Sequence, residues 1–516
     1  MHNLSDLLSR AAFERPDRVA IKLDQIEHSY AALDKAATQA AGLLSAHGVQ
    51  PGDRVGIMLP NIPHFPICYY GALRAGAVVV PMNPLLKERE VAFHLSDSEA
   101  KVLLAWHDVA DAAQAGAKQA DADCILLKPG EFDALLARCP PPAEIAERRL
   151  DDPAVLLYTS GTTGTPKGAE LTHDNLLRNV EITVELFGFD ERSVTLGALP
   201  LFHAFGQTCA LNATVSVGGM LTLIPRFDAG MALDIIERDR VTIFEGVPTM
   251  YAAMLNHPRA GEADASSLEV CVSGGAALPI EIMHAFEEKF DCQILEAYGL
   301  SETSPVASSN RRDRERKPGS IGLPIDGVEM RVIDNQGTEV PQGGIGEVAI
   351  RGHNVMKGYW RRPQETADAI DKDGWFKTGD LASVDQDGYF FIVDRKKDLV
   401  IRGGYNVYPR EVEDVLYEHP DVHQAAVIGI PHNVLGEEVA AAVVLKAGAH
   451  STPAELRAFV KLRIAAYKYP RHIWFVDELP QGPSGKILKR EIKPPDTLLT
   501  AEQSDLTPVL QVVERR

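Results

Sequence analysis

Residues 155–168 read VLLYTSGTTGTPKG, a short apolar run that passes into a segment rich in glycine, serine and threonine. The apolar run predicts a strand at Val155–Tyr158, and a helical pattern begins near Thr172. Glycines let a backbone wrap closely around an anion, while amides, hydroxyls and a lysine can bind its oxygens. The segment is not a Walker A loop, because Pro166 stands where that motif has the glycine before its lysine. We therefore predict a phosphate-binding loop that follows a strand and precedes a helix; a plain polar turn is the alternative.

Short apolar runs alternate with amphipathic segments on both sides of this loop, up to about residue 300. The first such pair is a strand at Val55–Leu59 and a helix at Pro63–Arg74. Further strands are predicted at Val102–Ala105, Val194–Leu199, Met220–Ile224, Val241–Phe244, Val270–Ser273 and Gln293–Glu296, and further helices at Ala229–Arg238 and Pro279–Lys289. Strands separated by segments of helix length indicate an α/β fold with parallel sheet.

The pattern changes from about residue 318 onward, where short strands alternate with Gly/Asp turns. Strands are predicted there at Val328–Asp334, Gly346–Gly352 and Gly388–Val393, which indicates a β-rich subdomain. Beyond a charged segment, the predicted elements are a helix, two strands and a second helix, at Pro409–His419, Ala425–Ile430, Val439–Leu445 and Pro453–Leu462. We therefore predict an α/β fold with a large N-terminal domain, residues 1–394, followed by a small α+β C-terminal domain, residues 395–516.

The composition narrows the class of protein. The chain has 516 residues, of which 45% are hydrophobic and 24% charged, the balance of a globular protein with several domains. Its net charge of −20 disfavours binding to nucleic acid or anionic lipid. The six cysteines form no C-x-x-C pair, and we find neither a signal peptide nor a stretch apolar enough to cross a membrane. These features predict a cytoplasmic protein, and they leave open contact with a membrane surface and the oligomeric state, a homodimer being one alternative.

Five further motifs follow the glycine-rich loop. They are SGGAAL at 273–278, YGLSET at 298–303, TGD at 378–380, DRKKD at 394–398 and PSGK at 483–486. Together with the loop, and in this order, they resemble the signatures of the adenylate-forming superfamily, which includes acyl-CoA synthetases, luciferases and the adenylation domains of peptide synthetases. The resemblance runs from about residue 10 to residue 492. It implies that a carboxylic acid reacts with ATP to give acyl-AMP and pyrophosphate, and that a thiol then attacks the acyl group.

The resemblance implies a nucleotide site drawn from several motifs. The β- and γ-phosphates would be held by Thr159, Ser160, Gly161, Thr162, Thr163, Gly164 and Lys167. The adenine would stack on Tyr298, which precedes Gly299, and its other face would be lined by the backbone of Gly274, Gly275 and Ala276. The ribose hydroxyls would bind Asp380, because an ionised carboxylate only accepts hydrogen bonds, and Arg395 would assist.

The resemblance also implies which groups act on the reacting atoms. Glu302 would help to hold Mg²⁺ between the phosphates, and Thr303 would contact the α-phosphate. Lys486 would bridge the α-phosphate and the substrate carboxylate as a flexible point charge. His203 matches a histidine at the acyl pocket and thiol tunnel, although an interior hydrogen-bonded imidazole is an equal alternative.

Domain motion is a further implication of the resemblance. Lys397 lies at the matched hinge, about which the C-terminal domain would rotate after adenylation. That rotation would bring the turn at Gly403 and Gly404 beside the pantetheine arm of CoA.

The acyl pocket is expected, from positions relative to the motifs, to be lined by Phe205, Gln207, Phe244, Val247, Pro248 and Val306. Ala204 stands where amino-acid-activating relatives have an aspartate that pairs with the α-ammonium group of the substrate. Without that aspartate the ammonium group would be buried without a partner, which argues against an amino acid substrate. The short stretch from Tyr359 to Thr378 lacks an insertion common in relatives that load carrier proteins, which favours CoA. Ile401 stands where luciferases and many plant-type ligases have a lysine for the second half-reaction, which disfavours a luciferase.

The C-terminal run Asp394–Glu413 is most similar to bacterial medium- and long-chain fatty acid ligases. We therefore predict an AMP-forming acid–thiol ligase, namely an ATP-dependent fatty acyl-CoA ligase that uses Mg²⁺ and CoA. The alternatives are an aryl- or arylpropenoyl-CoA ligase and an acyl-AMP ligase that loads a carrier protein. A non-catalytic nucleotide-binding relative is disfavoured, because Lys486, Glu302 and Asp380 are all present.

Overall fold

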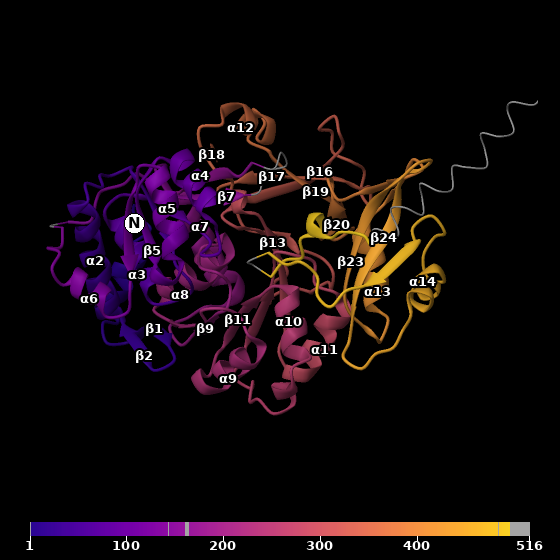
Figure 1. The fold of residues 1–516 in the computed structure, drawn as a ribbon, viewed down its shortest axis with the longest axis horizontal. Coiled ribbons are helices and arrows are strands. Elements are labelled where there is room, and N and C mark those ends of the chain that lie inside the picture. Colours follow the sequence, from indigo (N-terminus) through magenta and orange to yellow (C-terminus); the bar gives the residue numbers. More distant parts are fainter. Residues whose placement is uncertain (1, 143, 160–164, 483–484, 496–516) are drawn as a thin grey trace, which may run out of the picture. The chain divides into compact units, whose positions relative to one another are not determined.

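The computed structural model describes residues 2–142, 144–159, 165–482 and 485–495, and Figure 1 shows its ribbon. The chain divides into two compact units. Unit 1 comprises Met1–Ala276, Ala285–Met330 and Ala349–Thr378, and unit 2 comprises Ala277–His284, Arg331–Val348 and Gly379–Arg516.

Unit 1 contains a seven-stranded sheet with the order β18-β8-β7-β4-β3-β5-β6. Its strands are β3 (Arg54–Met58), β4 (Val78–Pro81), β5 (Ala100–Trp106), β6 (Asp123–Leu127), β7 (Pro153–Thr159), β8 (Lys167–Thr172) and β18 (Gly358–Tyr359). Strands β3 to β7 pair in parallel, whereas β8 is antiparallel to both β7 and β18. The helices in this part of the sequence are α1 (Asp6–Glu14), α2 (Tyr30–Ala46), α3 (His64–Arg74), α4 (Glu88–Ser98), η1 (His107–Val109), α5 (Ala110–Gln119) and α6 (Glu131–Leu136).

A second, nine-stranded sheet has the order β15-β14-β13-β12-β11-β9-β10-β1-β2. Its strands are β1 (Val19–Leu23), β2 (Ile26–Ser29), β9 (Val194–Gly197), β10 (Met220–Leu223), β11 (Ile243–Gly246), β12 (Val270–Ser273), β13 (Ile294–Gly299), β14 (Val306–Ser309) and β15 (Leu323–Pro324). The strands from β1 to β13 in this order pair in parallel, so their carboxyl ends meet at one edge, where open α/β sheets bind ligands.

The helical elements between residues 173 and 369 are α7 (His173–Phe187), the π-helix η2 (Gly206–Asn212), α8 (Ala213–Val217), α9 (Ala229–Asp239), α10 (Pro248–Leu255), η3 (Pro258–Gly261), α11 (Ile280–Phe290), η4 (Ser301–Thr303) and α12 (Pro363–Ala369). The parallel strands are short and apolar on both faces: every residue of β4 and of β12 is buried. Such runs fit sheets that are covered on both faces.

Two smaller sheets contain the later strands. One has the order β16-β17-β19-β20 and consists of β16 (Val328–Ile333), β17 (Gly346–Gly352), β19 (Phe376–Val384) and β20 (Phe390–Arg395). The other has the order β22-β21-β24-β23, with β25 beside β24, and consists of β21 (Val400–Arg402), β22 (Tyr405–Val407), β23 (Val422–His432), β24 (Gly436–Leu445) and β25 (His472–Phe475). The helices here are α13 (Pro409–Tyr417), α14 (Pro453–Lys461) and η5 (Lys489–Glu491). The predicted α/β class is confirmed.

The helix predicted to begin near Thr172 is α7, which follows Thr172; the hydroxyl of Thr172 accepts a hydrogen bond from the amide of Asn175 at 3.1 Å. The sequence did not predict strand β8, which lies between the loop and this helix. β8 pairs antiparallel with β7 and places Thr159 opposite Lys167. The loop therefore joins two adjacent strands, and its two ends are fixed by the same sheet.

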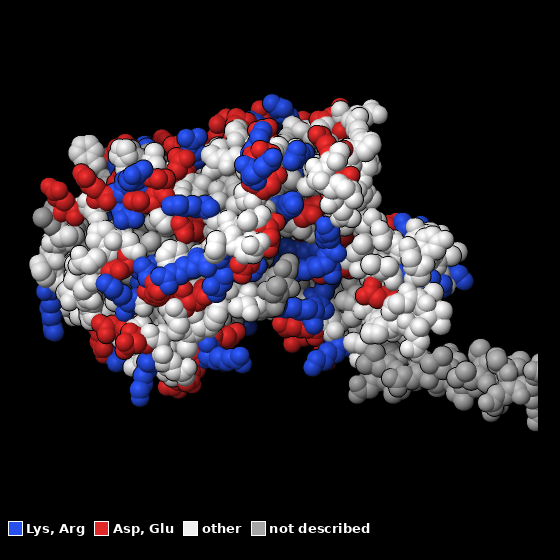
Figure 2. Space-filling model, turned by 90° about the horizontal axis from the view of Figure 1, so that it is seen from above, with Lys and Arg blue, Asp and Glu red and all other residues white. Residues whose placement is uncertain are grey.

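Charged side chains of both signs occur across the face drawn in Figure 2. Within the described part of the chain, no helix combines the length and the apolar character needed to cross a membrane.

Candidate active site

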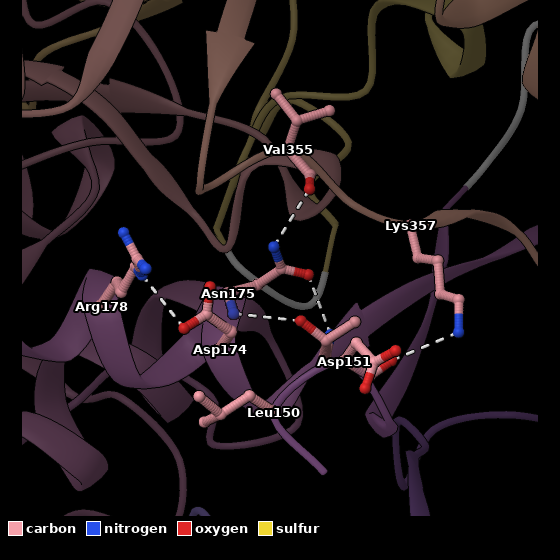
Figure 3. A pocket seen from close by; sticks show the side chains of 8 residues that line it. Leu150, Asp151, Asp174, Asn175, Arg178, Val355 and Lys357 are labelled. Carbon is pink, nitrogen blue, oxygen red and sulfur yellow. Dashed lines mark hydrogen bonds and ion pairs between the residues drawn. The ribbon is translucent and has the colours of Figure 1, made fainter. Parts of the chain in front are cut away.

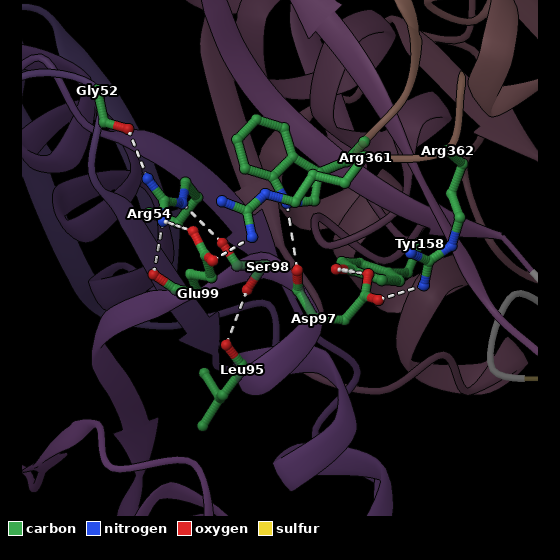
Figure 4. A network of polar contacts seen from close by, with 10 residues as sticks. Gly52, Arg54, Leu95, Asp97, Ser98, Glu99, Tyr158, Arg361 and Arg362 are labelled. Carbon is green, nitrogen blue, oxygen red and sulfur yellow. Dashed lines mark hydrogen bonds and ion pairs between the residues drawn. The ribbon is translucent and has the colours of Figure 1, made fainter.

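The strand that leads into the glycine-rich loop is anchored by polar contacts of its last residues. The hydroxyl of Tyr158 donates to Asp97 Oδ2 at 2.8 Å, and the carboxylate of Asp97 also pairs with Arg362 (Figure 4). Trp360 Nε1 donates to the backbone oxygen of Asp97 at 3.2 Å. Burial raises the pKa of Tyr158, and Asp97 raises it further, so the phenol keeps its proton and stays a donor. The loop residues Ser160, Gly161, Thr162, Thr163 and Gly164 lie outside the described residues.

Glu302 lies where the two ends of this loop meet. Its Oε1 accepts hydrogen bonds from Thr159 Oγ1 at 3.2 Å and from the hydroxyl of Tyr359 at 3.0 Å. Lys167 Nζ lies 5.2 Å from the centre of the Tyr359 ring. Burial raises the pKa of Tyr359, and Glu302 raises it further, which keeps the phenol a donor to the carboxylate. The structure therefore brings together Thr159, Lys167 and Glu302, which the sequence places far apart.

This arrangement fits a magnesium ion bound with a polyphosphate. Glu302 is 8% exposed, and within the described part of the chain its carboxylate accepts hydrogen bonds from two hydroxyl groups, those of Thr159 and Tyr359. Among the described residues no group of three or more His, Cys, Asp or Glu side chains could form a protein metal cage. Mg²⁺ usually binds one or two carboxylates together with substrate phosphates, and Glu302 fits that pattern. Tyr359 was missed by sequence reasoning, because no nearby motif marks it.

Thr303 is fully buried and takes part in the turn that carries Glu302. Its hydroxyl accepts from the Leu300 amide at 2.8 Å and donates to the Pro305 oxygen at 2.6 Å. These bonds fix the backbone directly beside Glu302. Its contact with an α-phosphate stays a prediction.

The predicted adenine-binding segments lie at the carboxyl ends of neighbouring parallel strands. Gly274, Gly275 and Ala276 follow β12, and Tyr298 and Gly299 end β13, which pairs with β12. Tyr298 is half-buried, whereas Gly275 and Ala276 are exposed. A Cβ on Gly299 would lie 1.7 Å from the backbone oxygen of Pro305, so only glycine fits beside the turn that carries Glu302. The strands place these segments side by side, as the motif order alone could not.

In unit 2, Asp380 and Arg395 face each other across two antiparallel strands. They are register partners on β19 and β20, and Arg395 Nε lies 3.3 Å from Asp380 Oδ1. Asp380 is 5% exposed.

Lys486 belongs to the same charged group. It is half-buried, and burial lowers its pKa to about 8, with Arg395 lowering and Asp380 raising it. This ammonium group lies near a carboxylate and a guanidinium and is poorly hydrated. Such a group is suited to binding an anionic reaction centre. The structure therefore gathers Asp380, Arg395 and Lys486 in one unit.

The predicted hinge and thiol-side turn are both exposed. Lys397 lies in the turn Lys396–Asp398 between β20 and β21. Gly403 and Gly404 form the turn between β21 and β22, with φ of +57° and +83°, values that favour glycine. Rotation about Lys397 and the approach of this turn to CoA stay predictions.

Of the residues predicted for the acyl pocket, Phe205 and Val247 pack against the Gly274–Gly275 turn, and the others lie on neighbouring elements. Phe205 packs on the Gly274 backbone, since a Cβ there would lie 3.0 Å from its ring, and Val247 lies 3.4 Å from the corresponding position on Gly275. Gln207 is fully buried on η2, Pro248 is half-buried and Val306 is buried on β14.

Phe244 is not brought to the side of β11 that faces η2. Its ring centre lies 5.0 Å from that of Tyr251, and a Cβ on Gly246 would face the same two rings. Glu245, between them, therefore points to the opposite face. The strand prediction Val241–Phe244 ended one residue before Glu245, so sequence reasoning missed this side chain.

His203 contacts the start of η2. Its Nδ1 accepts a hydrogen bond from the Phe205 amide at 3.3 Å, and the ring is half-buried. This contact is compatible with both of the roles predicted for it, a structural imidazole or a group beside the substrate.

A separate surface pocket of about 350 Å³ lies at the start of α7 (Figure 3). It is lined by Leu150, Asp151, Thr172, Asp174, Asn175, Arg178, Val355 and Lys357. Arg178 pairs with Asp174 at 3.0 Å, and Lys357 Nζ donates to the backbone oxygen of Asp151 at 3.2 Å. None of the predicted site residues lines it, so it is distinct from the groups described above.

Comparisons with known proteins agree with these observations. The AMP-binding enzyme family matches residues 8–360, and the AMP-binding enzyme C-terminal domain family matches residues 411–486. The chain is 38% identical to a long-chain-fatty-acid–CoA ligase of Bacillus subtilis, with 96% of this chain and 94% of the relative covered. It is 41% identical to a feruloyl-CoA synthase of an Amycolatopsis species, with 94% and 97% covered. The crystal structure of ATP-bound MatB from Rhodopseudomonas palustris matches with a TM-score of 0.89 at 35% identity, covering 98% of this chain and all of that chain.

These matches confirm the predicted relationship, the fold class and the assignment to AMP-forming acid–thiol ligases, which use a carboxylic acid, ATP, Mg²⁺ and CoA. Because the relatives align over nearly their whole length, the relationship extends to both units and not to the nucleotide motifs alone. The chain belongs to the AMP-binding enzyme family.

Proposed function

We propose that this enzyme is an ATP-dependent fatty acyl-CoA ligase. The observation that carries the proposal is the meeting of Thr159, Lys167 and Glu302 at the two ends of the glycine-rich loop. It supplies hydroxyl donors, a cation and a magnesium-binding carboxylate for the triphosphate of ATP. The 38% identity to a long-chain fatty acid ligase supports the acyl class.

The first half-reaction joins the substrate carboxylate to the α-phosphorus of ATP. A carboxylate oxygen forms the new bond while the bond to pyrophosphate breaks, which gives acyl-AMP. Both partners are anionic, so the protein must offset their repulsion and align them. Bound Mg²⁺ would supply positive charge between the phosphates, and Glu302 is the residue that would hold it. Lys486 would place its ammonium between the carboxylate and the α-phosphate.

Asp380 and Arg395 would orient the nucleotide through its ribose. Asp380 accepts hydrogen bonds only, and the Arg395 guanidinium at 3.3 Å keeps it oriented. Tyr298 would stack on the adenine over the backbone of Gly274, Gly275 and Ala276, which line its other face.

The second half-reaction transfers the acyl group to sulfur. The thiol of CoA loses its proton and attacks the acyl carbon, and the bond to AMP breaks. We assign this step to the domain arrangement in which residues 395–516 have rotated about Lys397 and the Gly403–Gly404 turn lines the thiol path. A cytoplasmic location fits this chemistry, because ATP and CoA are both available there.

A second candidate is an arylpropenoyl-CoA ligase. The 41% identity to a feruloyl-CoA synthase favours it, and the nucleotide chemistry would be unchanged. Apolar walls alone discriminate weakly between an alkyl chain and an aryl ring.

The test is release of AMP and pyrophosphate with ATP, Mg²⁺ and a panel of acids, each with and without CoA. The panel runs from acetate through long-chain fatty acids to coumarate, ferulate and benzoate. Turnover that peaks on a fatty acid and requires CoA supports the proposal. A peak on an aryl acid selects the second candidate, and acyl-AMP that accumulates despite CoA overturns both in favour of a carrier-protein acceptor.

A further inference from the structure

Glu245 is a fully buried carboxyl group whose role the ligase chemistry does not explain. It is 0% exposed on β11, and neither of its oxygens has a hydrogen-bond partner among the described residues. Buried polar groups are nearly always hydrogen-bonded in folded proteins, so a carboxyl with two unsatisfied oxygens calls for a partner from outside the chain.

The strand geometry shows which way Glu245 points. Phe244 and Gly246, on either side of it, face Tyr251, so Glu245 faces the opposite side of β11. The π-helix η2 packs on β11, and burial together with the nearby Glu245 carboxyl raises the pKa of Cys209 on η2. Glu245 therefore points toward η2, which carries Gln207 and follows Phe205.

Two more polar atoms on η2 are unsatisfied. Gln207 Oε1 and Thr208 Oγ1 are fully buried and lack a partner within the part of the chain that the structure describes, although Gln207 Nε2 donates to the Leu201 oxygen at 3.4 Å. The amide orientation set by that bond leaves Oε1 as an acceptor. A short π-helix is a feature often found at functional sites, and this one concentrates polar groups inside an apolar core.

The position of Glu245 relates this polar group to the acyl pocket. It lies one residue inside the carboxyl end of β11, and the next strand ends in the Gly274–Gly275 turn against which Phe205 and Val247 pack. A substrate that enters at the carboxyl edge of the sheet would meet Phe205 and Val247 first. Its far end would then reach Glu245.

We propose that Glu245, with Gln207 and Thr208, is the specificity determinant of the acyl pocket and selects acids whose far end carries a neutral hydroxyl group. This inference rests on the proposed ligase function and specifies its substrate class. A hydroxyl both donates and accepts, and it can satisfy an acceptor such as Gln207 Oε1 and a donor such as a protonated carboxyl.

The protonation of Glu245 explains why the substrate group that it selects is neutral and not charged. Burial raises the pKa of Glu245 well above its usual range, which favours the protonated carboxyl, a group that can donate a hydrogen bond. Gln207 and Thr208 carry no charge either. An unsubstituted methyl end would leave the Glu245 carboxyl, Gln207 Oε1 and Thr208 Oγ1 without a partner. Sites built to bind a hydroxyl reject analogues that lack it.

The experiment compares matched acids in CoA-dependent AMP release. One set is ω-hydroxydodecanoate, dodecanoate and ω-aminododecanoate, and the other is p-coumarate and cinnamate. We expect the wild-type enzyme to show kcat/KM at least about 10-fold higher for the hydroxylated member of one set. The set in which the preference appears tells whether the hydroxyl stands on an alkyl chain or on a ring.

Three variants assign the preference to the polar group. Glu245→Leu should bring the hydroxyl-to-parent ratio close to one, whereas Glu245→Gln should keep most of it, because an amide matches a protonated carboxyl in shape and also donates and accepts. Gln207→Leu should lower the ratio in part. Thermal unfolding of each variant checks folding; if Glu245→Leu does not fold, the lowered ratio expected for Gln207→Leu decides.

Distinct results overturn the inference and the proposed function. The inference is wrong if the wild-type enzyme turns over the hydroxylated acid and its unsubstituted parent equally in both sets. It is also wrong if the hydroxyl-to-parent ratio is unchanged in Glu245→Leu and Gln207→Leu, or if ω-aminododecanoate is preferred, which would make Glu245 a carboxylate counter-ion. The proposed function fails instead if no acid in the panel supports CoA-dependent AMP release.

Discussion

Lys486 should reduce the stability of the fold while serving the chemistry, and replacing it with methionine should separate the two effects. Burial lowers the pKa of Lys486 from 10.5 to about 8. Such a change corresponds to a penalty of at most about 3 kcal/mol for carrying the charge in the folded state at pH 7. Lys486→Met keeps the length and apolar stem of the side chain without the charge. We therefore expect the variant to lose acyl-AMP formation and to resist unfolding better than wild type at pH 7.

The pH dependence gives the sign of the effect. Below pH 8 the lysine is protonated in both the folded and the unfolded chain, so the full penalty applies; above about pH 10.5 it is neutral in both, and the penalty disappears. The stability advantage of Lys486→Met should therefore be largest at pH 7 and shrink between pH 8 and 10.5. Urea unfolding of both proteins across this range, followed at unit 2, measures the difference.

A neighbouring lysine provides the control for this prediction. Lys489 Nζ pairs with Glu413 at 2.7 Å, and although burial works to lower its pKa, Glu413 and Asp394 outweigh that effect and raise it. Lys489→Met removes an attractive partner and should destabilise the fold. If Lys486→Met is destabilised as much as Lys489→Met, or if its advantage does not change with pH, the burial argument for Lys486 is refuted.

Three further changes test other parts of the structure. Tyr359→Phe removes the 3.0 Å hydrogen bond to Glu302 but keeps the ring beside Lys167. Loss of a hydrogen bond to a charged group costs about 1.5–3 kcal/mol, so kcat/KM for ATP should fall by at least 10-fold. An unchanged kcat/KM would show that Glu302 does not need this hydrogen bond. Gly299→Ala would place a Cβ 1.7 Å from a backbone oxygen and should destabilise unit 1 by about 3 kcal/mol in thermal unfolding, whereas Gly261→Ala, with only a flexible lysine end 3.5 Å away, should have little effect. Lys397→Pro fixes φ at the predicted hinge and should preserve pyrophosphate release while blocking CoA transfer; equal loss of both steps would contradict the hinge assignment.

Much of the fold could be predicted from the sequence because the parallel strands are continuous apolar runs bounded by turns. Val270–Ser273 was predicted with the bounds that the structure gives it. β8 was missed because its residues, Lys-Gly-Ala-Glu-Leu-Thr, mix charge, glycine and apolar side chains and become a strand only by pairing with β7 and β18. Local pattern carries no information about such pairing.

Strand pairing also brings together residues that the sequence keeps apart. Asp380 and Arg395 stand in separate motifs, yet strand register sets them opposite each other. Their roles at the nucleotide were named from the family resemblance and stay a prediction. Tyr359, whose hydroxyl donates to Glu302, stands in none of the motifs.

The residues of the acyl pocket were expected only from their positions relative to the motifs, and they stay a prediction. Successive side chains of a strand face opposite sides, so Phe244 faces Tyr251 whereas Glu245 faces η2. The sequence could show this only if the end of β11 had been predicted correctly. The specificity of this enzyme is therefore best sought in buried polar atoms that lack a partner among the described residues. Buried polar groups are nearly always paired in folded proteins, so we expect the substrate to supply the missing partners of Glu245 and Gln207.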